Sequence, residues 1–181
     1  MLRDLIGKHS SSNSTNSEKI ILIFDTTAFL AKYHLQLWGR NIEIYTTQSV
    51  VNEVRDSESK SALELGLSIA RINILEPQKT YLEKVKKNAF KLGVLHKLSK
   101  TDLEVAALAL ELSERGRKVV VVTDDYMLQN LLLDIGIGFK PLRTTGIKKL
   151  RRYKIKCPVC GYTSIRSDEE ICPICGYRFR S

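Results

Sequence analysis

Residues 19–25 read KIILIFD and residues 118–125 read KVVVVTDD, so two strongly apolar runs each end in aspartate. Neither run alternates apolar with polar residues, a pattern typical of strands that are buried on both faces of a parallel sheet. Ligands bind at the carboxyl edge of such sheets, where the strand order reverses, so the residues at these strand ends are candidates for chemistry. They are Asp25, Asp124 and Asp125.

Further strand and helix patterns alternate along the chain. Strands are expected at 42–47, 72–75 and 137–142, and helices at 26–39, 49–56, 61–70, 80–92, 99–115 and 126–136. Strands separated by helices predict an α/β domain with helices on both faces of the sheet, and we place this domain at residues 19–142.

Length and composition exclude several classes of protein. The 181 residues are 43% hydrophobic and 27% charged, so the chain can bury a core and fits one domain with a small appendage. No apolar run approaches the roughly 18 residues of a membrane-spanning helix, and the N-terminus has no apolar secretory signal. We therefore expect a cytoplasmic protein in a reducing setting. The serine-rich run at 10–17 predicts a flexible N-terminal extension over residues 1–18.

Positive charge is concentrated at the C-terminal end of the chain. The net charge is +9, and residues 143–181 carry ten basic and three acidic side chains, a net of +7. This tail predicts an anionic partner, nucleic acid first and a membrane surface second, and the alternative is a solubilising surface. Aromatic residues between the basic ones suit single-stranded RNA. The expected RNA-binding residues are Lys148, Lys149, Arg151, Arg152, Tyr153, Lys154, Lys156, Arg178 and Arg180.

All four cysteines lie in this tail, as CPVCGY at 157–162 and CPICGY at 172–177. In a reducing setting the doubled motif indicates metal ligation, and the alternative is a redox dithiol. Two tight turns supply four thiolates, the tetrahedral set that Zn²⁺ prefers, and they leave no open coordination position. We expect one structural zinc ion in a ribbon at 154–181, after a basic linker at 143–153. Its ligands are Cys157, Cys160, Cys172 and Cys175.

Two further acids are candidates for the carboxyl edge of the sheet. Glu53 lies in the helix after the second strand, and Asp102 lies in the first turn of the helix at 99–115. Two carboxylates about 4 Å apart repel by roughly 4 kcal/mol at an effective dielectric constant of 20, so a cluster of them requires cations. Oxygen ligands suit Mg²⁺ or Mn²⁺, and one or two such ions activate water for attack on a phosphodiester.

Each of these acids also has a structural interpretation. Ser99 and Asp102 fit a capping box, and Asp124 or Asp125 fits a cap for the helix that follows. Glu53 fits a solvated charge on a helix. From the residues alone, both interpretations stay open.

Four segments of the chain resemble the acidic motifs of PIN-domain ribonucleases. They are FDTTAFL at 24–30, TTQSVVNEVRD at 46–56, LSKTDLEVAALALEL at 98–112 and VVVVTDDYMLQNLL at 119–132. With the C-terminal CPxCGY pair added, the chain is similar to the archaeal-type Nob endonucleases, which mature the 3′ end of small-subunit ribosomal RNA.

This resemblance implies a PIN-like three-layer α/β fold with a parallel sheet in the order 3-2-1-4-5, plus the zinc ribbon. The catalytic acids that it implies are Asp25, Glu53, Asp102 and Asp124, and the Mg²⁺ or Mn²⁺ ligands among them are Asp25, Asp102 and Asp124. Asp125 is implied as an auxiliary ligand or helix cap. The neighbours expected to help by hydrogen bonding are Thr26, Ser99 and Thr123.

The resemblance also implies an activity, that of a metal-dependent endoribonuclease acting on precursor small-subunit rRNA near its 3′ end. Its partners would be RNA and ribosome assembly proteins, with no membrane. Two alternatives stay open: a PIN-type ribonuclease that cuts another RNA, such as a toxin, and a catalytically silent RNA-binding assembly factor. The zinc module argues against the toxin, and the intact set of acids argues against the silent factor.

Overall fold

The structure is a computed structural model that describes residues 19–37, 39, 41–69, 71–154, 156–164, 169 and 171–179. The expected N-terminal extension at 1–18 lies outside the described residues, as does Arg180 among the expected RNA-binding residues. In the part of the chain that is described, none of the helices is both long and apolar enough to cross a membrane.

A parallel sheet of five strands forms the centre of the body. The strands are β1 (Ile20–Phe24), β2 (Ile42–Thr46), β3 (Ile72–Ile74), β4 (Lys118–Val122) and β5 (Gly138–Lys140). Their order is β3-β2-β1-β4-β5, which confirms the expected topology. Because Phe24 pairs with Val122, β1 and β4 end side by side. The chain therefore leaves both strands at one point of the carboxyl edge, at Asp25 after β1 and at Thr123, just before Asp124, after β4.

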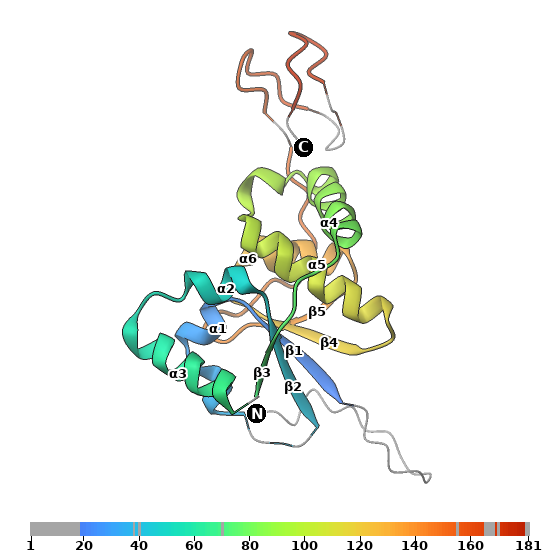
Figure 1. Ribbon diagram of the computed structural model, residues 1–181. Helices are drawn as coiled ribbons and strands as arrows, with labels where there is room; N and C mark the ends of the chain where they lie inside the picture. The colour runs from blue at the N-terminus through green and yellow to red at the C-terminus, as the bar shows by residue number, and fades with distance from the viewer. Residues whose placement is uncertain are drawn as a thin grey trace.

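Helices cover both faces of this sheet. They are α1 (Thr26–Leu30), α2 (Gln48–Glu53), α3 (Ser57–Ser68), α4 (Lys79–Leu92), α5 (Lys100–Glu114) and α6 (Tyr126–Asp134). Figure 1 shows α1 and α3 on one side of the sheet and α4, α5 and α6 grouped on the other. The α/β three-layer architecture expected from the sequence is confirmed.

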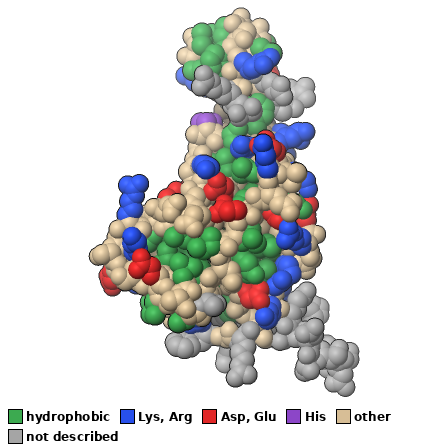
Figure 2. Space-filling model, viewed as in Figure 1, with side chains coloured by type: hydrophobic (Ala, Val, Ile, Leu, Met, Phe, Trp, Pro, Cys, Tyr) green, Lys and Arg blue, Asp and Glu red, His purple; other side chains and the backbone are tan. Residues whose placement is uncertain are grey.

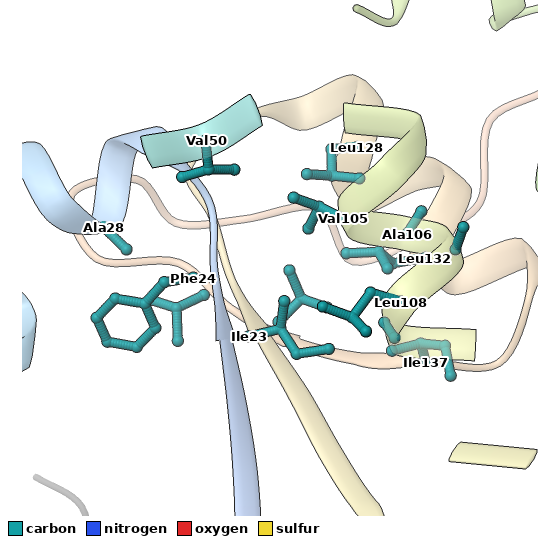
Figure 3. Packing of buried hydrophobic residues seen from close by; sticks show 14 of the residues in the cluster. Ile23, Phe24, Ala28, Val50, Val105, Ala106, Leu108, Leu128, Leu132 and Ile137 are labelled. Atoms are coloured by element: carbon teal, nitrogen blue, oxygen red, sulfur yellow. The ribbon is translucent and has the colours of Figure 1, made fainter. Parts of the chain in front are cut away.

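The core lies on both sides of β1. Ile23 and Phe24 are fully buried and point to opposite faces of the sheet, as period-two strand geometry requires. Figure 3 shows Ile23 directed toward Val105 and Leu108 of α5, with Phe24 on the other side. Each such side chain contributes about 1.5–3 kcal/mol of burial energy, so β1 is fixed from two sides. This packing sets the position of the residue that follows β1.

The helix expected over 26–39 is wrong beyond α1. Lys32 has a φ of 52°, a left-handed conformation that interrupts a right-handed helix. The chain then turns through a short 3₁₀ helix, η2 (Tyr33–Leu35). The break brings the Tyr33 ring to 5.9 Å from the Phe24 ring, centroid to centroid, so aromatic packing stabilises the turn in place of further helix.

Residues 143–153, expected as a basic linker and called the strap from here on, are attached to the body. The Asn130 side-chain amide donates to the Arg151 carbonyl at 2.7 Å and accepts from the Arg151 N–H at 2.8 Å. The Tyr153 N–H donates to the carbonyl of the last residue of α4 at 3.0 Å. A Cβ on Gly93, which has a φ of +74°, would lie 2.1 Å from the Tyr153 carbonyl oxygen. The strap therefore packs closely on the end of α4.

The ribbon forms a small lobe beyond the strap, at the top of Figures 1 and 2. Its described residues have a core of their own, made of Cys157, Cys172 and Phe179. Phe90 from α4 packs against this core, so the ribbon contacts the same end of α4 as the strap does.

Candidate active site

Asp25 follows β1 and caps the N-terminus of α1, and only 6% of its surface is exposed. Its Oδ1 accepts hydrogen bonds from the Thr27 hydroxyl at 2.8 Å and the Ala28 N–H at 3.0 Å. Burial raises the pKa of Asp25 to about 6 despite these hydrogen bonds, and the negative charge of Asp102 adds to the rise. The carboxylate is thus fixed where its charge is unfavourable without a cation.

Asp102 lies in the first turn of α5, where the capping box allowed by the sequence is confirmed. Its Oδ2 accepts from the Ser99 N–H and the Ser99 hydroxyl, both at 2.8 Å. No hydrogen bond within the described part of the chain reaches Oδ1 of Asp102. Burial raises the pKa of Asp102, and the charges of Asp125 and Glu53 raise it further. Oδ2 of Asp102 therefore caps α5, and Oδ1 is available to a ligand.

Glu53 is the last residue of α2 and joins two other helices. Its Oε2 accepts from the Thr26 hydroxyl at 2.6 Å, and its Oε1 accepts from the Thr101 hydroxyl at 2.5 Å. Thr26 begins α1 and Thr101 lies in the first turn of α5, so one carboxylate ties three helices together at the carboxyl edge. The sequence prediction missed Thr101. Its place beside Asp102 in SKTD is the signal that could have identified it.

The carboxylate of Asp124 binds the backbone of the segment that follows β5. Its Oδ1 accepts from the N–H groups of Leu142 at 2.8 Å, Arg143 at 3.0 Å and Thr144 at 3.2 Å. Burial acts to raise the pKa of Asp124, but these N–H groups together hold it below its usual value. The carboxylate that the resemblance implied as a metal ligand is therefore engaged by the protein itself, at the start of the strap.

Asp125, expected only in an auxiliary role, has a different environment. Its Oδ1 accepts from the N–H groups of Met127 and Leu128, both at 2.7 Å, and so caps α6. No hydrogen bond from another described residue reaches its Oδ2. The negative charge of Asp125 raises the pKa of Asp102. The structure thus brings Asp125 into electrostatic contact with Asp102.

The polar neighbours expected from the sequence each donate to an acid: Thr26 to Glu53, Ser99 to Asp102 and Thr123 to Asp25. Thr27 was missed. Its hydroxyl donates to Asp25 and accepts from the Asp124 N–H at 3.2 Å, which joins the chain after β1 to the chain after β4.

The electrostatic contacts link carboxylates from four separate elements at one edge of the sheet: Asp25, Glu53, Asp102 and Asp125. These carboxylates are spread apart and do not form one compact group. Within the described residues, only the cysteines form a group of three or more possible metal ligands whose donor atoms all lie within 4.8 Å of one another. An open set of oxygen ligands suits Mg²⁺ or Mn²⁺ and leaves room for substrate oxygen atoms around the ion.

In the ribbon, two turns of the same construction bring the cysteines together. The N–H of the first cysteine of each turn donates to a tyrosine carbonyl, at 2.7 Å for Cys157 and 2.8 Å for Cys172. Gly161 and Gly176 have φ values of 75° and 71°, the left-handed conformation that favours glycine. This backbone requirement explains the glycine that follows each CPxC.

The four thiolates fit a zinc ion. The Sγ atoms of Cys157 and Cys175 lie 3.5 Å apart, as do those of Cys160 and Cys172. Zn–S bonds of about 2.3 Å at tetrahedral angles place sulfur atoms about 3.8 Å apart. The cluster therefore matches a closed four-cysteine site with little rearrangement, as expected from the sequence.

The expected RNA-binding side chains lie on the strap and the ribbon. Those that are exposed are Lys148, Lys149, Arg151, Arg152, Lys154, Lys156 and Arg178. Tyr153 is half-buried, and the Lys97 Nζ lies 4.0 Å from the centroid of its ring. Lysine and arginine side chains reach the surface of both the body and the ribbon in Figure 2.

Residues 22–112 match the family model described as the PIN domain of ribonuclease. Endoribonuclease Nob1 of Pyrococcus abyssi is 40% identical over 143 residues, 79% of this chain and 81% of that protein. Ribonuclease VapC3 of Aeropyrum pernix is 43% identical over 140 residues, 77% of this chain and 97% of that protein. The 20S-pre-rRNA D-site endonuclease NOB1 of Saccharomyces cerevisiae is 29% identical over 91 residues, 50% of this chain and 20% of that protein. With the sheet order and the acids at its carboxyl edge, these matches show that the chain belongs to the PIN-domain ribonuclease family.

Proposed function

We propose that this protein is a metal-dependent endoribonuclease that cleaves precursor small-subunit rRNA near its 3′ end. The observation that carries the proposal is the open group of acids at the carboxyl edge, where burial and mutual repulsion raise the pKa values of Asp25 and Asp102. Carboxylates held in this way are stabilised by divalent cations.

The residues that would hold the cation are Asp25, Asp102 and Asp125, with Glu53 as the fourth acid. A divalent cation bound there lowers the pKa of a water molecule and stabilises the charge that develops on the phosphodiester. The chain's own contribution is orientation. Hydrogen bonds from Ser99 and Thr27 fix the carboxylates before substrate arrives, and such outer partners tune metal sites.

Asp124 takes a different role in this proposal. Its Oδ1 binds the N–H groups at the start of the strap, so it acts as a structural anion. The strap and the ribbon then carry the positive charge that binds the RNA backbone, with one zinc ion as the structural support of the ribbon.

The names of the relatives support ribosomal RNA as the substrate. The Pyrococcus abyssi protein is named Endoribonuclease Nob1, and the yeast protein is named for cleavage of 20S pre-rRNA. An assembling small subunit also contains proteins, and ribosome assembly proteins are proposed as further partners in the cytoplasm.

A second candidate is a ribonuclease that acts on another RNA. The relative named Ribonuclease VapC3 supports it, because it is 43% identical and 97% of its length is matched. The chemistry of the acids would be the same, so only the choice of RNA separates the two candidates.

The test is incubation with Mn²⁺ and an RNA that spans the 3′ end of the small-subunit rRNA, beside an unrelated structured RNA of equal length. We expect one cut near the mature 3′ end, with 5′-phosphate and 3′-hydroxyl products, because the nucleophile is water rather than the RNA 2′-hydroxyl. Asp102→Asn should stop cleavage, and Asp134→Asn on α6 is the matched control. Equal cutting of both RNAs would favour the second candidate. Products with 2′,3′-cyclic phosphate would refute the mechanism.

A further inference from the structure

A hollow of about 560 Å³ lies between α6 and the strap. Its lining combines the cations of Lys148, Lys149 and Arg151 with the rings of Tyr126 and Tyr153. None of the described residues that line it is acidic. Cationic side chains beside an aromatic ring bind the phosphate and the base of a nucleotide, and the volume falls within the range of about 300–1,000 Å³ for small-ligand sites.

Buried amide side chains of α6 hold the strap wall of this hollow in place. Asn130 is 2% exposed and makes both of its hydrogen bonds to the backbone of Arg151. Gln129 is fully buried; its Oε1 accepts from the Ile147 N–H at 3.0 Å, and its Nε2 donates to the Thr123 carbonyl at 2.9 Å. A buried amide is costly unless its polar atoms are paired. These two are paired with the strap, so the hollow is formed before a ligand arrives.

The hollow begins at the acidic edge. Tyr126, the first residue of α6, directly follows Asp125 in the chain. Its side chain is among the exposed ones, with 46% of the residue accessible, so its ring is available for stacking. A strand of RNA with a phosphate at the acids therefore places a neighbouring nucleotide close to Tyr126.

We propose that this hollow is a subsite for one nucleotide of the RNA strand, next to the bond that is cut. Its base stacks on Tyr126, and its phosphate binds the cations of Lys148, Lys149 and Arg151. Asn130 is a positioning residue, because it holds the backbone of Arg151. The subsite rests on the proposed RNA substrate, but it concerns binding and not cleavage.

The first test measures binding of a short single-stranded RNA to the full-length protein without divalent cations, so that no cleavage occurs. Tyr126→Ala should weaken binding about 5- to 160-fold, the range that base–aromatic stacking provides. Tyr126→Phe keeps the ring face and is the matched control, with binding close to that of the wild type. Unchanged binding by Tyr126→Ala would overturn the subsite.

A second test locates the nucleotide. A series of RNAs carries one abasic nucleotide at each position around the cleavage site. For the wild-type protein, an abasic nucleotide at one position of the RNA should weaken binding as much as Tyr126→Ala does. For the Tyr126→Ala protein, an abasic nucleotide at that same position should weaken binding little further. A loss that is independent of position, or fully additive with Tyr126→Ala, would contradict a defined subsite.

The phosphate contacts are tested by the salt dependence of binding. Lys148→Gln with Lys149→Gln should make the slope of log K against log[salt] less steep by about 1.4, or 0.7 for each lost contact. The control is Lys60→Gln with Lys118→Gln, because both lysines are exposed and lie on α3 and at the start of β4. Equal slopes for the two double variants would remove the cations from the subsite.

Asn130→Ala removes no charge, so a purely structural role predicts lower thermal stability with an unchanged salt slope. The positioning role predicts a less steep slope at a temperature where the variant is folded, because Arg151 is no longer held in the hollow. An unchanged slope would refute that role.

These outcomes separate the subsite from the proposed function. Specific rRNA cleavage with normal binding by Tyr126→Ala refutes the subsite alone. Position-dependent binding through Tyr126 without cleavage of rRNA refutes the proposed substrate and keeps the subsite.

Discussion

The ribbon and the acidic edge both gather groups of like charge, but they are built in opposite ways. In the ribbon, two short turns supply four sulfur atoms within 4.8 Å of one another, which is a complete ligand set. At the edge, the carboxylates come from separate helices and strand ends, and hydrogen bonds occupy one oxygen of Asp102 and of Asp125, while no described residue donates to the other oxygen. The ribbon is therefore suited to a structural ion, and the edge to ions that exchange ligands with a substrate.

The two regions differ in what stabilises their fold. The described residues of the ribbon have a buried apolar core of only Cys157, Cys172 and Phe179, so we expect its fold to depend on a bound metal. The edge rests on the large core of the body around β1. Metal loss should therefore unfold the ribbon, whereas at the edge it should leave a folded but inactive protein.

The largest expected effect is the loss of zinc from the ribbon. Structural zinc in small modules contributes about 10 to 16 kcal/mol of apparent binding energy, so Cys157→Ser should unfold the ribbon and leave the body folded. NMR spectra measure the folding of the ribbon and of the body separately, and elemental analysis measures the zinc content. Val159→Ala, in the same turn but not a ligand, should keep one zinc per chain. A wild-type protein purified without zinc would remove the basis of the comparison.

The next effect is on turnover. Asp125→Asn should lower the cleavage rate about 10³-fold or more, because metal ions supply several kcal/mol of transition-state stabilisation. Asp124→Asn should instead loosen the start of the strap, so that RNA binding weakens while the rate on saturating RNA is largely kept. Single-turnover cleavage and RNA titrations distinguish the two. If Asp124→Asn alone abolished turnover, the roles assigned to the neighbours would be reversed.

A smaller effect concerns stability and pH in the protein without divalent cations. The folded pKa of Asp25, about 6, lies above its ordinary value of 3.8, so the folded state binds this proton more tightly than the unfolded state does. Protonation of Asp25 therefore stabilises the folded state. This contribution is complete below about pH 4 and is lost as the pH rises through 6. Above that pH, Asp25→Asn should raise the free energy of unfolding by about 1–3 kcal/mol.

Denaturant unfolding between about pH 4 and 8 provides the measurement for Asp25→Asn. The control is Asp134→Asn, which removes a charge from the far end of α6. Addition of Mn²⁺ should reduce the difference in the free energy of unfolding between Asp25→Asn and the wild type, since only the wild type is stabilised by the ion. A variant that is less stable than the wild type at pH 8 would show that Asp25 is not strained.

An effect of similar size comes from the hydroxyl groups that hold the acids. Thr101→Val removes the donor to Glu53 and keeps the shape of the side chain, so we expect a 10- to 100-fold loss of Mn²⁺ affinity or activity. Thr101→Ser keeps the hydroxyl and should remain near the wild type. Zinc content should be the same in all three proteins. Wild-type activity and Mn²⁺ affinity in Thr101→Val would show that Glu53 needs no support from α5.

The features that sequence reasoning predicted are those that local patterns determine. The apolar runs located β1 and β4, and the capping box at Ser99 was visible in four letters. The sheet order was predicted only through the family resemblance. The break at Lys32 was missed, because the apolar pattern continues past it and the contacts that favour the turn, such as Tyr33 with Phe24 and His34 with Ala62, are distant in sequence.

The different environments of Asp124 and Asp125 could not be predicted from the sequence, for a physical reason. The two residues are adjacent and chemically identical, so composition and spacing treat them alike. What separates them is a set of N–H groups at 142–144, which bind Asp124 from a loop that lies 18 to 20 residues further along the chain. The strap was predicted as a linker for the same reason, since its contacts with Asn130 are distant in sequence.

The position of β1 between β2 and β4 has a consequence for synthesis of the protein. Ile20 pairs with Lys118, so the central strand β1 cannot pair with β4 until the ribosome has synthesised β4, much later. Pairing between distant segments forms slowly and only once both have emerged. A nascent chain that ends before β4 carries Asp25, Glu53 and Asp102 without the strand beside them and without Asp125. The acidic edge is therefore completed only after β4 has been synthesised, and we expect chains that end before β4 to lack the proposed nuclease activity.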